Sequence, residues 1–251
     1  MSDLKKIYSI RFSRLDSTNA WAKTHAYSLA PHDLTCITAE EQTAGRGRFA
    51  KSWFSPKGNI HASIFFSIPK GACYLPNLAQ VLSFCCVKVL EKKGFSPQIK
   101  WPNDLLLMGK KVAGVLTETI DLKERQGVVV GVGMNVNVTD VLLQTIDQPA
   151  TSLAEISREQ WNLHDILHPI LEEFNKDLFR LEQEGFAPFQ KDYQERLALK
   201  GEWIHYQKED QMYEGLCDSI SEDGHLNVIL PSGEIDKLHS GEIKNLRKLD
   251  R

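Results

Sequence analysis

Residues 98–138 read QIKWPNDLLLMGKKVAGVLTETIDLKERQGVVVGVGMNVNV, and this stretch decides the fold class. It is a run of segments rich in valine, leucine, isoleucine and threonine, joined by short turns such as Met108–Lys111. Such composition, broken by turn residues, is typical of β-strands. The apolar run that begins at Gly127 is typical of a strand buried in a sheet. We therefore predict a β-sheet at the centre of the molecule.

The sequence before and after this stretch alternates between strand and helix patterns. Ser17 is a plausible N-cap for a helix with apolar residues at helical spacing, and Gly94 is placed to end a second helix at its C′ position. Residues 151–199 also have helical periodicity. Additional strands are predicted at Tyr8–Ser13, at Leu34–Glu40 and at His61–Pro69.

Beyond Gly201 the segments become short and alternating, with turn signals at residues 222–224 and 231–233. This pattern predicts a small antiparallel, barrel-like module. The expected fold class is α+β: a catalytic domain over residues 1–200, built on a mixed sheet flanked by helices, and a small β-barrel domain over residues 201–251.

Bulk composition excludes several function classes. The 251 residues are 42% hydrophobic and 25% charged, with a formal net charge of −3. A nucleic-acid-binding domain would normally be strongly basic, so no nucleic-acid partner is expected. No segment has the length and apolarity of a membrane span or of a signal peptide. The five cysteines are scattered and show no CxxC spacing, which predicts reduced thiols in a cytoplasmic protein.

A long polar, glycine-rich loop is predicted at residues 41–59, and it contains Gly45-Arg46-Gly47-Arg48. Glycines allow backbone N–H groups to converge, and guanidinium groups bind phosphate or carboxylate through paired donors. The alternative is a flexible, solvated turn, because a short basic glycine loop is a weak motif.

Three other segments carry polar residues at strand ends. Asn103 and Asp104 follow a proline, and Asp104 could orient a lysine or hold Mg²⁺; alternatively, both residues cap a turn. Lys111 could reach into a site or extend to the surface. The glycines of Gly131–Asn137 would let a ligand or backbone approach closely, or mark a bulge. His164 and His168 have metal-ligand spacing on a helix, but there is no HExxH, so an ordinary helix surface is favoured.

Taken in order, these segments resemble the biotin protein ligase family over essentially the full length. The motifs that match are DSTN (16–19), EQTAGRGR (41–48), WFSP (53–56), KWPNDLLL (100–107), KKVAGVLTE (110–118), GVGMNVN (131–137), ATSL (150–153) and GEI (241–243). The resemblance implies a fold like that of class II aminoacyl-tRNA synthetases and biotin ligases, with an SH3-like C-terminal barrel.

The resemblance also implies roles for individual residues. The biotin-binding residues would be Ser17, Thr18, Asn19, Gln42, Gly45, Arg46, Gly47, Arg48, Trp53, Lys111 and Gly114. The ATP-binding residues would be Arg46, Arg48, Asn103, Asp104, Lys111 and Asn135. Lys111, Arg48 and Asp104 would be catalytic, and Asp104 would be a ligand of Mg²⁺.

By the same resemblance, the enzyme would use ATP and Mg²⁺ to convert biotin to biotinyl-5′-AMP. It would then transfer biotin to a lysine of a biotin carboxyl carrier protein. The sequence leaves open whether the chain is a monomer or a homodimer.

The chain departs from the family pattern in two places. Family loops often continue the arginine run, whereas Phe49-Ala50-Lys51 follows here, and no aromatic residue for stacking on adenine follows Asn137 closely. The adenine contacts therefore stay unassigned. Some members of the family also repress transcription through a winged helix-turn-helix. We expect no counterpart of it here, because the catalytic pattern starts near residue 7. Two other functions compete: a lipoyl- or octanoyl-transferring relative, and an RNA- or peptide-binding adaptor.

Overall fold

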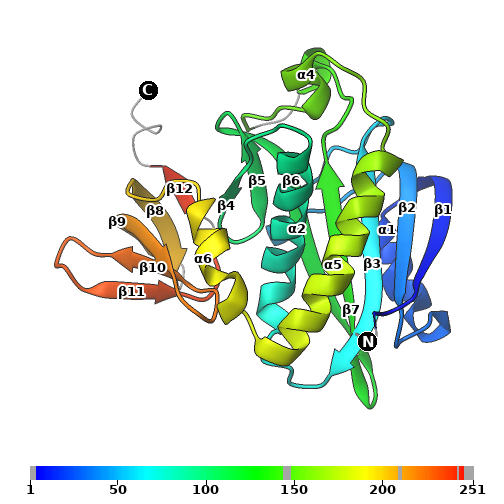
Figure 1. The fold of residues 1–251 in the computed structure, drawn as a ribbon, viewed down its shortest axis with the longest axis horizontal. Coiled ribbons are helices and arrows are strands. Elements are labelled where there is room, and N and C mark those ends of the chain that lie inside the picture. The colour runs from blue at the N-terminus through cyan, green and yellow to red at the C-terminus, as the bar shows by residue number, and fades with distance from the viewer. Residues whose placement is uncertain (1–3, 144–147, 209–210, 242, 246–251) are drawn as a thin grey trace.

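The computed structural model describes residues 4–143, 148–208, 211–241 and 243–245, which form two sheets and the helices around them (Figure 1). The larger sheet has the strand order β1-β2-β3-β7-β6-β5-β4. Its strands are β1 (Ile7–Leu15), β2 (Leu34–Gln42), β3 (Ile60–Pro69), β4 (Gln98–Lys100), β5 (Asp104–Leu107), β6 (Lys110–Leu122) and β7 (Arg125–Met134). Strands β1 and β2 are parallel and all other neighbours are antiparallel, which confirms the predicted mixed sheet.

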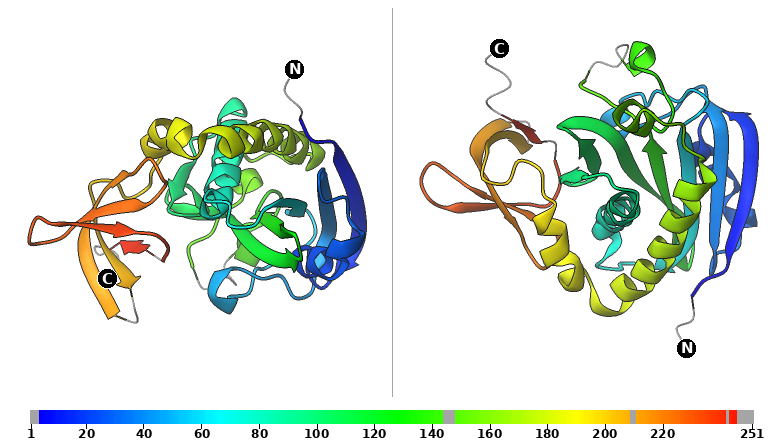
Figure 2. Two further views of the ribbon diagram at one scale, coloured as in Figure 1. Left: turned by 90° about the horizontal axis from the view of Figure 1, so that it is seen from below. Right: turned by 45° about the horizontal axis from the view of Figure 1, so that its top comes forward.

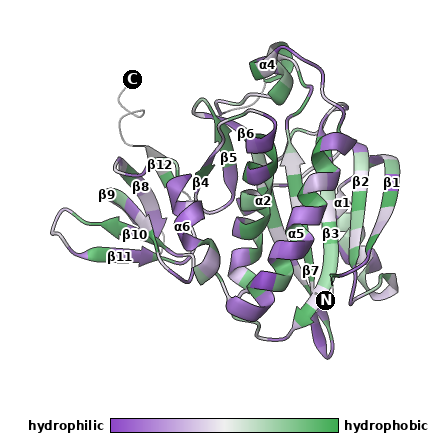
Figure 3. Cartoon of the chain, viewed as in Figure 1, coloured by the Kyte–Doolittle hydropathy of each residue, from purple (hydrophilic) through white to green (hydrophobic). Residues whose placement is uncertain are grey.

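Helices cover both faces of this sheet. Helix α2 (Leu78–Lys92) packs against β4–β7 and against α5 (His164–Glu184), whereas α1 (Thr18–His25) packs on the opposite face (Figures 1 and 2). As predicted, the Ser17 side chain caps α1 and Gly94, with φ of 86°, follows the C-cap of α2. In Figure 3 the outward side of α5 is largely hydrophilic, and β3 behind it is largely hydrophobic. Burial of these apolar faces holds the layers together.

Strand β3 shows how the two faces differ. Ala62, Ile64 and Phe66 join the main core beneath α2 and α5. The alternate positions face α1, and there Phe65 is apolar but His61 and Ser63 are polar and buried. Because neighbouring side chains on a strand point to opposite faces, one face of β3 builds the core while the other carries polar groups.

The smaller, antiparallel sheet follows the helical segment. Its strands, in the spatial order β11-β10-β9-β8-β12, are β8 (Trp203–Lys208), β9 (Gln211–Ile220), β10 (Leu226–Ile229), β11 (Ile235–Leu238) and β12 (Ile243–Asn245). It lies beside the β4 end of the large sheet, and α6 (Ala187–Glu195) packs on β9 (Figure 1). This sheet confirms the small C-terminal β-module, whereas the domain boundary at residue 200 stays a prediction.

Two further expectations concern the thiols and the helices. All five cysteines are free, and burial raises the pKa of Cys36 and Cys86 to about 12, so neither is a reactive thiolate. Within the described part of the chain, no helix is long and apolar enough to cross a membrane. The remaining short helices are α3 (Asp140–Leu143) and α4 (Leu153–Ser157).

The packing of α5 on the sheet predicts a large difference between two phenylalanines of that helix. Phe174 is fully buried, with its ring centroid 6.0 Å from that of Phe66, whereas Phe179 is 37% exposed. Phe174→Ala should lower the free energy of unfolding by about 3–5 kcal/mol, because it removes a large side chain from the core. Phe179→Ala, the control, should cost less than about 1 kcal/mol. Urea unfolding measures both, and equal losses would contradict this packing.

Candidate active site

A row of paired residues with two glycines at its centre crosses the middle of the large sheet on the α1 face. His61 of β3 pairs with Gly133 of β7, Gly133 pairs with Gly114 of β6, and Gly114 pairs with Asp104 of β5. Two residues further along β3, Ser63 pairs with Gly131 of β7. Because the two central positions of the row are glycines, the sheet offers a shallow floor on which other groups can lie.

Asn19 occupies the space above Gly131. A Cβ at that glycine would lie 2.2 Å from Asn19 Oδ1, closer than any real contact. The Asn19 amide donates to Glu118 Oε2 at 2.9 Å, and its Oδ1 lies 2.5 Å from the Ser63 hydroxyl. Lys23 Nζ lies 2.7 Å from the same Glu118 carboxylate. Asn19 is therefore held on both sides in one amide orientation.

Glu118 is ionised in this arrangement. Its partial burial acts to raise its pKa, but the hydrogen bonds from Lys23 and Asn19, with the charges of Lys23 and Arg46, hold the pKa below its ordinary value. An ionised carboxylate accepts hydrogen bonds only, which fixes the direction of the bond from Asn19.

Trp53 fills the space above Gly133, where a Cβ would lie 2.3 Å from its indole ring. The loop that carries Trp53 folds back on itself: Gly47 N–H donates to Lys51 O at 2.8 Å, and Trp53 N–H donates to Gly45 O at 2.9 Å. The predicted loop is thus largely irregular but closed by its own backbone bonds, with one short helical turn at η2 (Arg48–Ala50).

Lys111 points into the cavity. Its Nζ lies 2.7 Å from Asp104 Oδ1 and 5.3 Å from the centroid of the Trp53 ring, and only 16% of its side chain is exposed. Its backbone is held by the segment after residue 148, because Lys111 N–H donates to Pro149 O and Lys111 O accepts from Thr151 N–H. Of the two alternatives for Lys111, extension to the surface is excluded.

Arg48 links the loop to two distant segments. One of its terminal nitrogens lies 3.1 Å from both Asn103 Oδ1 and the carbonyl oxygen of Gly241. The Asn103 amide in turn donates to Val115 O on β6. Asn103 therefore has partners in tertiary structure, and the alternative that it only caps its own turn is excluded.

A second polar group lies at the start of α1. Gln42 Oε1 accepts from Thr18 N–H at 2.8 Å and lies 3.1 Å from the Thr18 hydroxyl, while Gln42 Nε2 donates to Ser55 at 2.9 Å. Thr18 also lies 2.6 Å from the Ser63 hydroxyl. These amide and hydroxyl groups form one continuous network beside Asn19.

One cavity collects most of the predicted site residues. It is lined by Ser17, Thr18, Asn19, Gln42, Arg46, Gly47, Arg48, Trp53, Asn103, Asp104, Lys111 and Gly114. Gly45 and Asn135 are not part of this lining. Gly45 lies one step back in the loop, and the Asn135 amide donates to Thr151 O at 3.1 Å, so their direct contacts with a ligand stay predictions.

The cavity also contains residues for which the sequence analysis assigned no role. They include Lys51, Ser52, Lys100, Trp101, Gln148, Gly241 and Ile243. The strand pattern of His61–Pro69 could have predicted that Ser63 lies on the same face as His61, because residues two apart on a strand point to the same side. No local pattern could have brought Gly241 to Arg48 across 193 positions.

The electrostatics of the cavity favour an anion. Among the described residues, its lining contains the basic side chains of Arg46, Arg48, Lys51, Lys100 and Lys111, and one carboxylate, that of Asp104. Five cations near one another repel unless negative charge is supplied, so a carboxylate or phosphate is the ligand chemistry that fits.

Two buried polar atoms in this lining have no hydrogen-bond partner among the described residues. They are Trp53 Nε1 and His61 Nδ1. Burial lowers the pKa of His61, opposed by its hydrogen bond to Pro56 O at 3.0 Å, so the ring is neutral at neutral pH. Because the carbonyl only accepts, Nε2 carries the proton and Nδ1 is an acceptor. Unpaired buried groups of this kind are usually satisfied by a ligand or by water.

The chain itself offers little to a metal ion. No cluster of three or more histidine, cysteine, aspartate or glutamate residues suited to metal binding occurs in the described ranges. His164 and His168 are both more than half exposed and lie outside the cavity. Asp104 is already paired with Lys111, so its role as a Mg²⁺ ligand stays a prediction.

The order of these motifs and the geometry of the cavity agree with similarities to known proteins. The biotin/lipoate A/B protein ligase family matches residues 11–135. The chain is 31% identical over 231 residues to a biotin–[acetyl-CoA-carboxylase] ligase of Paracoccus denitrificans, with 88% of this chain and 94% of that protein aligned. A bifunctional ligase/repressor BirA of Bacillus spizizenii is 30% identical over 234 residues, covering 92% of this chain and 71% of that protein.

The chain belongs to the biotin/lipoate A/B protein ligase family. It is therefore a ligase. A solved structure of a biotin protein ligase from Aquifex aeolicus, described as a complex with biotin and ATP, superposes with a TM-score of 0.82 at 29% identity. The superposition covers 94% of this chain and 97% of that one, so both the mixed sheet and the small C-terminal sheet agree with the fold of this ligase.

The close approach of Asn19 to Gly131 predicts strong coupling between these residues. Gly131→Ala should lower the free energy of unfolding by about 1–3 kcal/mol, because the added methyl displaces Asn19 from its buried hydrogen bonds. In an Asn19→Ala background the same change should cost less than about 1 kcal/mol, since the methyl then has room. Urea unfolding of the four proteins measures the coupling. Additive losses would show that Asn19 does not lie over Gly131.

Proposed function

We propose that this ligase activates biotin with ATP to form biotinyl-5′-AMP and transfers the biotin to a lysine of a biotin carboxyl carrier protein. The observation that carries the proposal is that one cavity is lined both by the polar side chains at the start of α1, here called its polar half, and by the basic groups of Lys111 and Arg48, here called its cationic half. Biotin has a neutral polar head and a carboxylate tail, and ATP supplies phosphates to the cationic half.

The polar half suits the ureido ring of biotin. Ser17, Thr18, Asn19 and Gln42 would supply donors and acceptors. The bond that Asn19 donates to Glu118 and the bond that it accepts from Ser63 would keep its amide in one orientation. Trp53 would cover the apolar part of the ligand, and Gly114 would let it lie against β6. The hydrogen-bond capacity left at Trp53 Nε1 and His61 Nδ1 supports a polar ligand at this place.

The cationic half suits the first chemical step. A carboxylate oxygen of biotin would attack the α-phosphorus of ATP, forming an O–P bond while the bond to pyrophosphate breaks. Both reactants are anions, so Lys111 and Arg48 would reduce their repulsion and stabilise the charge of the transition state. Asp104 would hold Lys111 in place, as its 2.7 Å contact supports. Arg46, Asn103 and Asn135 would contribute to nucleotide binding.

In the second step the amine of the carrier lysine would attack the acyl carbon of the adenylate. The C–N bond forms, the C–O bond to AMP breaks, and the amine gives up its proton to the surroundings. The loop of Gly45, Arg46, Gly47 and Arg48 would cover the adenylate and exclude water, which would otherwise hydrolyse the mixed anhydride. Mg²⁺, if bound, would neutralise charge on the nucleotide phosphates, and Asp104 would supply a carboxylate of the lining to it.

Other attributes of the enzyme rest on its relatives and on the sequence. A cytoplasmic location is proposed from the reduced thiols and the likeness to bacterial ligases. The repressor function named for the Bacillus relative is not carried over, and the absence of DNA binding stays a prediction. A lipoyl-transferring activity is the alternative within the family, because the family description includes lipoate ligases.

The proposal predicts exchange of labelled pyrophosphate into ATP that depends on biotin. Adding a biotin carboxyl carrier domain should give one mass increment of biotin on one lysine, measured by intact mass. Lipoate in place of biotin is the matched control and should support neither reaction. Exchange with lipoate but not with biotin would establish the alternative substrate, and no exchange with either would contradict the proposal.

Removing the charge of Lys111 should impair adenylation far more than folding. The rate of pyrophosphate exchange by Lys111→Ala should fall on the order of 10²–10³-fold, because the ammonium serves charge that develops in the transition state. Lys110→Ala is the matched control, since that neighbouring side chain on β6 is exposed. Full exchange by a folded Lys111→Ala protein would exclude the catalytic role.

A further inference from the structure

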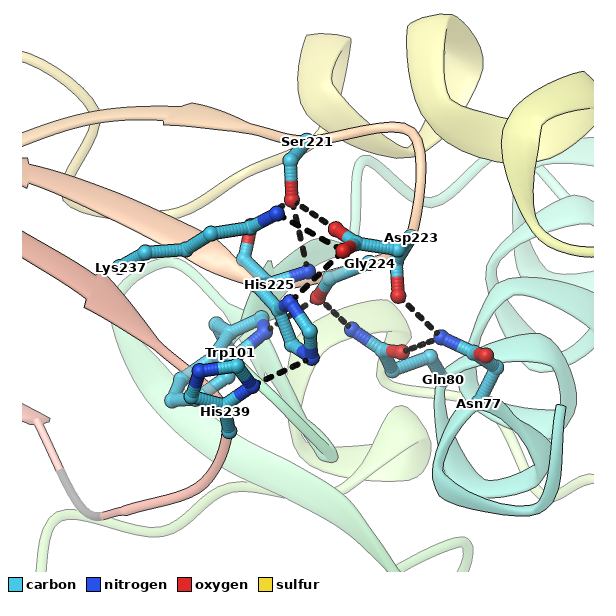
Figure 4. A network of polar contacts seen from close by, with 9 residues as sticks. All are labelled: Asn77, Gln80, Trp101, Ser221, Asp223, Gly224, His225, Lys237 and His239. Atoms are coloured by element: carbon cyan, nitrogen blue, oxygen red, sulfur yellow. Dashed lines mark hydrogen bonds and ion pairs between the residues drawn. The ribbon is translucent and has the colours of Figure 1, made fainter. Parts of the chain in front are cut away.

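The turn between β9 and β10 docks through its backbone on the start of α2 and on the turn between β4 and β5 (Figure 4). The Gly224 carbonyl accepts from Trp101 Nε1 at 3.0 Å and from Gln80 Nε2 at 2.6 Å. The adjacent Asp223 carbonyl accepts from Asn77 Nδ2 at 2.9 Å. Trp101, Gln80 and Asn77 are each at least 94% buried, so these bonds are shielded from water.

The docking leaves no space for a side chain at residue 224 of the turn. Gly224 has a φ of +84°, a left-handed conformation that favours glycine. A Cβ there would lie 2.3 Å from Asn77 Nδ2 and 2.6 Å from Gln80 Oε1. Because residue 224 is a glycine, its backbone carbonyl can lie directly against the indole of Trp101.

Trp101 belongs to the segment that carries two site residues. Asn103 and Asp104 follow it closely, at the turn between β4 and β5 and at the start of β5. The other face of this turn is held by Tyr193 of α6, whose hydroxyl donates to Pro102 O at 3.0 Å. A shift of Trp101 would therefore move the groups that contact Arg48 and Lys111.

A second carbonyl of the small sheet reaches the site directly. Gly241 O, just before β12, accepts from Arg48 at 3.1 Å, at the same guanidinium nitrogen that contacts Asn103. The small sheet thus contacts the basic loop at one point and the Trp101 turn at another.

A pair of histidines joins these two contacts (Figure 4). His225 follows Gly224, and its Nε2 lies 3.0 Å from Nδ1 of His239, two residues before Gly241. His225 Nδ1 lies 3.0 Å from Asp223 Oδ2, and Lys237 Nζ lies 2.7 Å from the same oxygen. The order of contacts is Lys237, Asp223, His225, His239.

We propose that the small C-terminal sheet positions the part of the site that binds ATP, here called the nucleotide half, through the backbone carbonyls of Gly224 and Gly241. The contact between His225 and His239 keeps these two carbonyls in fixed positions relative to each other. Trp101 is then a positioning residue for Asn103 and Asp104. The inference rests on the proposed function, because it concerns ATP rather than biotin. The biotin half is built from α1, β3 and β7, which the small sheet does not touch through these bonds.

The histidine contact makes the arrangement sensitive to pH. A hydrogen bond between two imidazoles needs one donor and one acceptor, which two protonated rings cannot provide. The groups that face His225 are Asp223 on its own turn, Lys237 on β11 and His239; Arg48 lines the same groove. Burial lowers the pKa of His225, and the charges of His239 and Lys237 add to this, against the opposing charge of Asp223. The folded state therefore prefers the neutral His225 ring, and the contact weakens as the pH falls through the lowered pKa of His225.

The test is to measure the dissociation constants of ATP and of biotin separately by calorimetry in Trp101→Phe. The variant keeps the ring but loses the donor to Gly224, so the constant for ATP should rise on the order of 5- to 10-fold. The constant for biotin should stay within about twofold of the wild type. Trp161→Phe is the matched control, because it loses an indole bond to Ser157 at 2.9 Å outside the cavity. It should change neither constant.

His239→Gln supplies a second measurement that does not depend on a buried residue. In the wild type the dissociation constant of ATP should rise as the pH falls from 7.5 to 5.5. This rise should exceed the change caused by the titration of ATP itself, which His239→Gln shares. In His239→Gln the ratio to the wild-type constant should fall with pH toward unity. Folded variants in which ATP and biotin respond equally, or a pH-independent ratio, would overturn the positioning role. A wild-type protein that binds neither ligand would instead overturn the proposed function and this inference with it.

Discussion

The missing side chains at Gly131 and Gly133 are the constraint on which the rest of the site depends. Both glycines lie on the site face of the central strand β7, and Asn19 and Trp53 occupy the volume that side chains there would fill. Two segments far apart in sequence, the start of α1 and the basic loop, can therefore approach the sheet closely enough to enclose a cavity. The opposite face of the same strand carries Val128, Val130 and Val132 and builds the core.

The cavity brings several positive charges together, and their mutual repulsion must be offset by the groups around them. Lys111 has a carboxylate partner at 2.7 Å, and the contacts of Arg48 include an amide oxygen and a carbonyl oxygen. These contacts hold both basic groups in fixed positions in the cavity, where they can act on an anion.

Backbone carbonyls join the small sheet to the ligase core. A carbonyl cannot change rotamer as a side chain does, so the contacts of Gly224 and Gly241 are as rigid as the turns that present them. Likeness to the Aquifex ligase over 94% of this chain includes the small sheet, so this sheet belongs to the common fold rather than to an appended module. The two histidines beside these carbonyls add a hydrogen-bonded contact between the two parts of the small sheet that reach the site.

The sequence alone determined the strands from β5 to β7, the capping of α1 by Ser17 and most of the motif residues that line the cavity, because periodicity, caps and motifs depend on neighbours along the chain. Only the tertiary structure decided which groups meet. It placed Asn19 and Trp53 over Gly131 and Gly133, left Gly45 and Asn135 outside the cavity lining, brought Ser63 against Asn19 and placed Gly241 in the lining. These contacts join residues 44 to 193 positions apart, and their geometry arises from sheet register and close packing, which no local pattern encodes.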